Sequence, residues 1–274
     1  PNRAPIPVYA ALISDLHVGS KMFMEKEFER FTCWLGGGFG DDRVKMVASH
    51  VKYVVIAGDV VDGVGIYPQQ IDELSIKDVY GQYEAAAKLL ENIPDHVKVI
   101  IIPGNHDASR RALPQPAIQE KYAEPLYEAR EICCLGDPCV ISLHGVNVLL
   151  YHGRSLDDVI SLVPGMKFQE PSKAMKLLLQ CRHLAPVYGQ RTPIAPERRD
   201  PLVIEDAPDV FHAGHVHVME YDAYRGSIVV NSGAWQRQTE YQKEMGHVPN
   251  PGIVPILNLH TLEIAPMDFT IRSD

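Results

Sequence analysis

The sequence predicts an α/β protein with two packed sheets, and two observations carry this prediction. In the first half, apolar strand-like runs alternate with amphipathic helical segments, an order that is typical of parallel βαβ units. In the second half, short strand-like runs are joined by two-residue turns, which indicates antiparallel hairpins. We therefore expect a mixed second sheet that packs on the first, with helices outside.

The first half supplies three strands and two helices. Apolar runs at residues 8–13, 53–57 and 98–102 are typical of buried strands. Residues at helical spacing predict one helix after the first strand and another after the second: Phe28, Phe31, Thr32 and Leu35, then Tyr80, Tyr83, Ala87 and Leu90. Gly36 to Gly38 end the first helix, and Pro94 closes the second.

The second half supplies three strand pairs. His144-Gly145 joins the runs 139–143 and 146–151, and Arg225-Gly226 joins the runs 218–224 and 227–230. Runs 253–259 and 263–269 predict a last antiparallel pair. The stretch from Gly153 to Pro208 is expected to be a mostly helical insertion, and it is rich in basic residues: Arg154, Lys167, Lys173, Lys176, Arg182, Arg191, Arg198 and Arg199.

Length and composition indicate one large folded domain. With 274 residues, 46% of them hydrophobic and 22% charged, the chain can bury a substantial core. We expect this domain at residues 8–274, and we interpret the proline-rich residues 1–7 as a linker from a missing N-terminal region. The net charge of −9 does not exclude nucleic-acid binding, because a local basic path or bound divalent cations can offset it.

The cysteines and the hydropathy pattern indicate the compartment. The five cysteines include no Cys-x-x-Cys pair, so buried free thiols are expected rather than disulfides or a thiolate zinc site. The chain has no apolar run of about twenty residues and no signal-peptide pattern, so no membrane partner is expected. These features favour a cytoplasmic protein.

Five polar clusters each follow a strand-like run, where α/β sheets place their ligands. They contain seven candidate metal ligands, namely Asp15, His17, Asp59, Asn105, His152, His215 and His217. Carboxylate, imidazole and amide oxygen suit Mn²⁺, Fe or Zn, and the two oxygens of Asp59 are able to bridge two cations. Two divalent cations can clamp a phosphoester and lower the pKa of an attacking water. The clusters therefore predict a two-metal hydrolytic site.

His106 is the candidate catalytic acid, because it lies beside Asn105 and is followed by Asp107, which we expect to orient its imidazole. Three other positions stay open between a role in the site and a structural one. Asp62 either supports the ligands or lies in a surface turn, and Arg154 either contacts phosphate or is a solvated arginine. Trp235 either stacks on a base or packs in the core. No role is assigned to His50, His96, His183 and His247.

Together the clusters resemble the calcineurin-like metallophosphoesterase superfamily, whose pattern is Asp-x-His, Gly-Asp, Gly-Asn-His-Asp/Glu, His-Gly and Gly-His-x-His. The resemblance implies a four-layer α/β/β/α sandwich and His106 as general acid. It implies that one metal takes Asp15, His17, Asp59 and His217, and that the other takes Asp59, Asn105, His152 and His215.

Residues 13–20, 58–67, 181–186 and 231–236 more closely resemble the small subunit of archaeal family-D DNA polymerase. That family's small subunit is a proofreading exonuclease that carries an OB-fold ahead of this domain and pairs with a large catalytic subunit. The resemblance implies a Mn²⁺-dependent 3′–5′ exonuclease acting on DNA, preferentially at single-stranded or mismatched 3′ ends. One alternative is a phosphomonoesterase or cyclic-nucleotide phosphodiesterase of the same superfamily. The other is a non-catalytic polymerase assembly subunit, like the related eukaryotic B-subunits that have lost these ligands.

Overall fold

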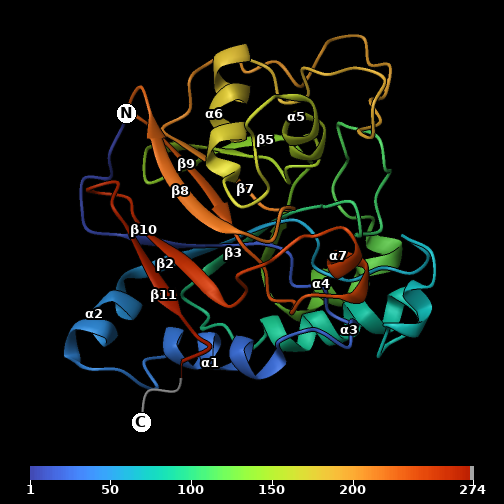
Figure 1. Ribbon diagram of the computed structural model, residues 1–274. Helices are drawn as coiled ribbons and strands as arrows, with labels where there is room; N and C mark the ends of the chain where they lie inside the picture. The colour runs from blue at the N-terminus through green and yellow to red at the C-terminus, as the bar shows by residue number, and fades with distance from the viewer. Residues whose placement is uncertain (272–274) are drawn as a thin grey trace.

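Two β-sheets pack face to face, and helices cover the outer face of each sheet (Figure 1). The structure is a computed structural model that describes residues 1–271, so the last three residues of the predicted domain lie outside the described residues. Helices α1, α3 and α4 pack on the six-stranded sheet, and α5 and α6 pack on the five-stranded sheet. The predicted α/β/β/α order of layers is confirmed.

The alternation of side chains along the central strands produces these layers. On β1 (Tyr9–Ile13), Ala10 and Leu12 belong to the apolar cluster between the sheets. Ala11 and Ile13 belong to the cluster beneath the helices. Because neighbouring side chains point to opposite faces of a strand, a continuous apolar run is buried on both sides.

The six-stranded sheet has the order β11-β10-β1-β2-β3-β4. Strands β1, β2 and β3 are parallel, as predicted for the first half, and β4, which was not predicted, is parallel to β3. Strand β10 is antiparallel both to β1 and to β11. The last pair therefore extends the first sheet rather than the second, since its partner is β1 at the other end of the chain. The bounds are Val51–Ala57 for β2, Lys98–Ile102 for β3, Ile132–Cys134 for β4, Ile253–Asn258 for β10 and Ile264–Asp268 for β11.

The five-stranded sheet has the order β5-β6-β7-β9-β8 and is mixed, as predicted. The φ angles of His144 and Gly145 are 48° and 86°, the left-handed pair that a two-residue hairpin turn requires. The bounds are Cys139–Leu143 for β5, Val146–Leu150 for β6, Val210–Ala213 for β7, Met219–Tyr224 for β8 and Ser227–Ser232 for β9.

Both helices predicted in the first half are present, as α1 and α3. Helix α2 was not foreseen, because it buries only Ala48 and so has no apolar stripe. Local capping starts it instead, with the Asp41 carboxylate accepting a hydrogen bond from the Val44 N–H. The bounds are Glu25–Leu35 for α1, Asp42–His50 for α2, Val79–Leu90 for α3, Glu120–Ala129 for α4, Leu156–Leu162 for α5, Pro171–Cys181 for α6, Glu240–Glu244 for α7 and Gln70–Asp72 for the 3₁₀ helix η1.

The insertion from Gly153 to Pro208 is less helical than expected. It contains α5 and α6, whereas residues 182–208 form no helix, so the prediction is wrong for the second half of the insertion. Five prolines, at positions 186, 193, 196, 201 and 208, interrupt any helix there. The Asp158 carboxylate fixes the path of this segment by accepting hydrogen bonds from the N–H groups of Arg191 and Thr192.

Several smaller predictions are also decided. All five cysteines are free, but none is buried, because the strands and helices that carry them turn these positions at least partly toward solvent. Trp235 is 2% exposed and packs against Phe28, which confirms the core role and rules out base stacking.

Among residues 1–7, Ala4 is buried and donates its N–H to the Leu259 carbonyl. In the described part of the chain, no helix has the length and apolar character needed to cross a membrane.

Candidate metal centre

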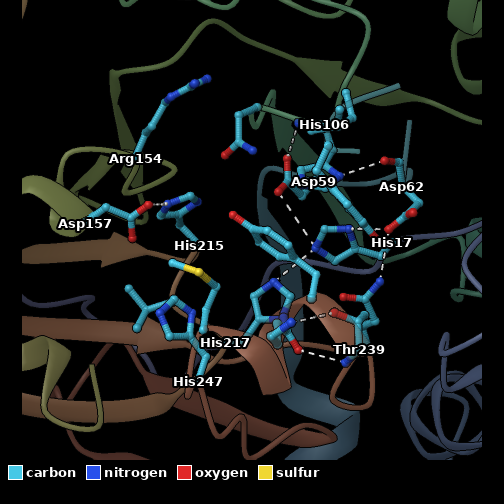
Figure 2. Close-up of a pocket in the computed structure, with 18 of the residues that line it drawn as sticks. His17, Asp59, Asp62, His106, Arg154, Asp157, His215, His217, Thr239 and His247 are labelled. Atoms are coloured by element: carbon cyan, nitrogen blue, oxygen red, sulfur yellow. Dashed lines mark hydrogen bonds and ion pairs between the residues drawn. The ribbon is translucent and has the colours of Figure 1, made fainter. Parts of the chain in front are cut away.

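The five predicted clusters meet at one end of the two sheets. Asp15 and His17 follow β1, Asp59 follows β2, and Asn105 follows β3. On the facing sheet, His152 follows β6, and His215 and His217 follow β7. Five of these side chains line a cavity of about 360 Å³, namely His17, Asp59, Asn105, His215 and His217 (Figure 2). Asp15 and His152 lie just behind them, 3.3 Å from His217 and from Asp59, respectively. All seven candidate ligands and His106 are therefore brought into one site.

One group of ligand atoms consists of Asp15, His17 and His217. The Nε2 atoms of His17 and His217 lie 3.1 Å apart. Asp15 Oδ1 lies 3.3 Å from His217 Nε2 and 3.8 Å from His17 Nε2. The three atoms lie within 4.8 Å of one another, close enough to share one cation.

The second group consists of Asp59, His152 and His215, whose ligand atoms also lie within 4.8 Å of one another. His152 Nε2 is 3.3 Å from Asp59 Oδ2 and 3.0 Å from Asn105 Oδ1, so the amide oxygen belongs to this group. Asp59 Oδ2 is also 3.8 Å from His17 Nε2 in the first group. One carboxylate oxygen therefore faces both groups.

The donor set fits divalent cations. Asp15 is fully buried, and its Oδ1 has no hydrogen-bond partner, an arrangement that is costly unless a cation satisfies the atom. Burial alone would raise the pKa of Asp15, but the charge of His217 and the close imidazoles of His17 and His217 outweigh it and hold the pKa well below its usual range. The pKa of Asp59 is likewise lowered, because nearby His152 and His106 outweigh the effect of burial. Both carboxylates are thus ionised, as metal ligands must be.

Backbone geometry at the site is specialised. Five candidate ligands have left-handed φ angles, a region that side-chain-bearing residues rarely adopt: Asp15 at 51°, His17 at 54°, Asp59 at 51°, His215 at 71° and His217 at 60°. Such conformations cost free energy and cluster at functional sites. Glycine at position 104 permits the close packing, since a Cβ there would overlap the Asp59 carboxylate.

Hydrogen bonds fix the orientation of both carboxylates. The backbone N–H of His106 donates to Asp59 Oδ1 over 2.8 Å, and the N–H of His215 donates to Asp15 Oδ2 over 2.9 Å. Each carboxylate therefore uses one oxygen to bind the backbone and turns the other toward imidazoles.

A further layer of polar groups orients the imidazoles. Asp62 is 1% exposed, and its Oδ1 lies 3.0 Å from His17 Nδ1, so it supports a ligand and does not lie in a surface turn. His152 Nδ1 lies 2.8 Å from the Ala57 carbonyl, which turns Nε2 toward Asp59. Such contacts set the tautomer and the position of imidazole ligands.

His215 and His217 are held by residues that the sequence did not single out. Asp157 Oδ2 lies 3.1 Å from His215 Nε2, and Gln242 Nε2 lies 2.9 Å from His217 Nδ1. His215 Nε2–H donates to Asp157, which leaves Nδ1 of His215 for the second group. No local motif marks these two residues, because each meets its histidine only in the folded chain.

His106 is oriented differently from the prediction. Its Nδ1 lies 2.7 Å from the Asp62 carbonyl oxygen, while the Asp107 carboxylate does not contact its ring. Instead, Asp107 accepts hydrogen bonds from the N–H groups of Val60 and Gly104 and from the Tyr83 hydroxyl. Both Asp107 oxygens are used in bracing the loops, so the prediction that Asp107 orients His106 is wrong.

Of the basic residues in the insertion, Arg154 and Arg191 line the cavity. Lys173 is paired with Glu170 instead, and Lys176 with Asp222. His247, which was assigned no role, is half-buried and also lines the cavity, with its ring centroid 4.2 Å from that of Phe168.

The similarity of this chain to known proteins identifies its family. The family of DNA polymerase alpha/epsilon B-subunits matches residues 10–221. This chain belongs to that family. The chain is 49% identical over 257 residues to the DNA polymerase II small subunit of Pyrococcus horikoshii, covering 94% of this chain and 41% of that protein. It is 50% identical over 248 residues to the small subunit of Archaeoglobus fulgidus, covering 90% and 50%, and 43% identical over 272 residues to that of Halobacterium salinarum, covering 98% and 52%.

The predicted resemblance to the small subunit of an archaeal polymerase is thus confirmed, and the chain spans about half the length of these relatives. Among solved structures, an archaeal phosphodiesterase aligns with 14% identity and a TM-score of 0.46, covering 95% of this chain and 99% of that one. Vps29 of Entamoeba histolytica, complexed with zinc, aligns with 12% identity and a TM-score of 0.39, covering 96% and 99%. TM-scores this low say nothing about the chemistry of the site.

Proposed function

We propose that this chain is the exonuclease domain of a polymerase small subunit, a two-metal phosphodiesterase that shortens DNA from its 3′ end. Mn²⁺ is the favoured cation, with Fe or Zn as alternatives. The observation that carries the proposal is Asp59 Oδ2, which lies 3.3 Å from His152 and 3.8 Å from His17 and so faces both groups of ligands. In this proposal Asp15, His17, Asp59 and His217 hold one cation, and Asp59, Asn105, His152 and His215 hold the other.

The cations would neutralise the phosphodiester and lower the pKa of an attacking water. The residues of the chain supply orientation and the proton. His106 Nδ1 is hydrogen-bonded to the Asp62 carbonyl, which leaves the Nε2–H of the protonated ring free. In the proposed mechanism this Nε2–H is donated to the departing 3′ oxygen. Burial lowers the pKa of His106, which makes its proton easier to transfer.

Arg154 and Arg191 provide positive charge in a cavity that is otherwise dominated by carboxylates and imidazoles. Burial lowers the pKa of Arg154, but arginine stays charged at any physiological pH. A guanidinium binds phosphate oxygens in pairs, so we assign these two arginines to the backbone of the DNA strand.

Membership of the polymerase subunit family supports DNA as the substrate and a large catalytic subunit as the partner. In that assembly the domain would remove mismatched 3′ ends.

The experiment that tests the proposal is digestion of 5′-end-labelled single-stranded DNA with Mn²⁺, with and without a chelator. We expect a ladder that shortens from the 3′ end and is abolished by the chelator. Asp59→Asn should be inactive, whereas Asp72→Asn, an exposed residue outside the cavity, should be fully active. Hydrolysis of a synthetic monoester without DNA cleavage would point to another phosphoesterase. A folded protein that binds no metal would point to an assembly role.

A further inference from the structure

Two aromatic rings form a stack in the wall of the cavity. Tyr67, in the loop that follows Asp62, and Tyr241, on α7, have ring centroids 5.0 Å apart and ring planes 22° apart. Both rings line the cavity, and Tyr67 is also 6.4 Å from the His106 ring. The order His106, Tyr67, Tyr241 therefore leads from the proposed catalytic acid outward to solvent.

The stack is held in place but is not part of the core. The Tyr67 hydroxyl donates to Glu73 Oε2 over 3.0 Å, which fixes the inner ring. Tyr241 is 43% exposed, and α7 buries none of its residues. The same helix carries Gln242, which contacts His217, so the platform and the metal ligand are fixed by one element.

We propose that Tyr241, backed by Tyr67, is the stacking platform for a nucleobase of the DNA strand, and that the base belongs to the penultimate nucleotide. The proposal rests on the proposed function, because it uses His106 as the proton donor. The leaving 3′ oxygen belongs to the penultimate nucleotide, and Tyr67 lies on the His106 side of the cavity. Such a platform accepts any base sequence at this position, since every base has a face that stacks on an aromatic ring.

A double-mutant cycle that combines a protein variant with a modified DNA strand tests the proposal. We expect an abasic residue at the penultimate position to slow cleavage by the protein by about 5- to 150-fold, the range for one base–aromatic stack. Tyr241→Ala should lose the same factor on intact DNA and lose nothing further on the abasic strand. Tyr241→Phe keeps the ring and should behave as wild type. Tyr221→Ala is the matched control, because Tyr221 is also 43% exposed but does not line the cavity.

Equal losses for Tyr241→Ala on intact and abasic strands would overturn the proposal, since they would indicate a merely structural effect. If the effect of Tyr241→Ala instead disappears on a strand with an abasic residue at the terminal position, the assignment to the penultimate nucleotide would be overturned.

A binding measurement separates this proposal from the exonuclease proposal. An oligonucleotide with 2-aminopurine at the penultimate position is titrated with the protein in Ca²⁺, and its fluorescence falls when that base stacks. We expect quenching by wild type and Tyr241→Phe but not by Tyr241→Ala. Quenching without cleavage in Mn²⁺ would leave the platform supported and the exonuclease proposal refuted. Binding of the strand by wild type without quenching would overturn the platform.

Discussion

Replacing Asp59 with alanine tests the central feature of the site, one carboxylate that faces two groups of ligands. Its Oδ2 lies 3.3 Å from His152 Nε2 and 3.8 Å from His17 Nε2. Two dications about 3.5–4 Å apart repel by roughly 17–19 kcal/mol at an effective dielectric constant of about 20. A bridging carboxylate at about 2.1 Å attracts each of them by roughly 16 kcal/mol on the same scale. We therefore expect double loading to fail without the bridge.

Asp15→Ala is the matched comparison. Each of the two carboxylates accepts one backbone N–H, from His106 in one case and from His215 in the other. Both variants therefore leave one N–H unpaired, and each should lose about 1–3 kcal/mol of the free energy of unfolding. Only Asp59 faces both groups, so any difference in metal loading comes from the bridge and not from damage to the fold.

Calorimetric titration with Mn²⁺ is the assay. We expect two binding events in the wild type, one remaining event in Asp15→Ala, and loss or strong weakening of both in Asp59→Ala. Urea unfolding should show that both variants are folded. Two undiminished binding events in folded Asp59→Ala would refute the reasoning.

Four further predictions follow from the geometry. His106→Ala should slow cleavage by about 10²–10⁴-fold and keep both metal-binding events, whereas loss of one event would make His106 a ligand. Asp157→Asn should weaken one Mn²⁺-binding event by about 10–100-fold through His215, and the exposed Asp222→Asn should change neither event. Cleavage should be faster on single-stranded and mismatched 3′ ends than on matched duplex, because paired ends must first melt at a cost of a few kcal/mol; equal rates on all three would contradict proofreading. Burial lowers the pKa of His212 to about 3, so the folded state stays neutral while the unfolded chain takes up a proton below about pH 6.5. This contribution to the free energy of unfolding is complete above that pH and falls by at most about 1.4 kcal/mol per pH unit between pH 6.5 and 3. Urea unfolding of the chelated protein at several pH values should show that the free energy of unfolding depends less steeply on pH in His212→Gln than in the wild type. An unchanged dependence on pH would contradict the prediction.

The candidate ligands were predictable because each is marked by its local sequence. Asp15, Asp59 and His152 all come directly after an apolar run that forms a strand, and parallel strands deliver their carboxyl ends to the same edge. The arrangement of layers was predictable for a similar reason, since apolar periodicity records which faces of a strand or helix are buried.

The orientation of His106, the proposed catalytic acid, shows where local reasoning fails. Asp107 is next to His106 in sequence, yet its carboxylate is turned to the N–H groups of Val60 and Gly104. The group that binds the His106 ring is the carbonyl of Asp62, 44 residues away. Adjacency in sequence does not set the direction of a side chain in a loop, because the φ and ψ angles of that loop decide it.

The sequence by itself determined the parallel strands of the first half, the seven candidate ligands and the family. Each of these is marked by a short contiguous stretch of residues, either an apolar run or a motif. Only the tertiary structure decided which groups support those ligands, as in the contact of Asp157 with His215 and of Gln242 with His217. It also placed Trp235 in the core beside Phe28, and it placed Tyr241, which we propose as the stacking platform, against Tyr67 at the cavity. These are contacts between segments that are far apart in the chain, and their geometry exists only once the two sheets have packed and brought the loops together.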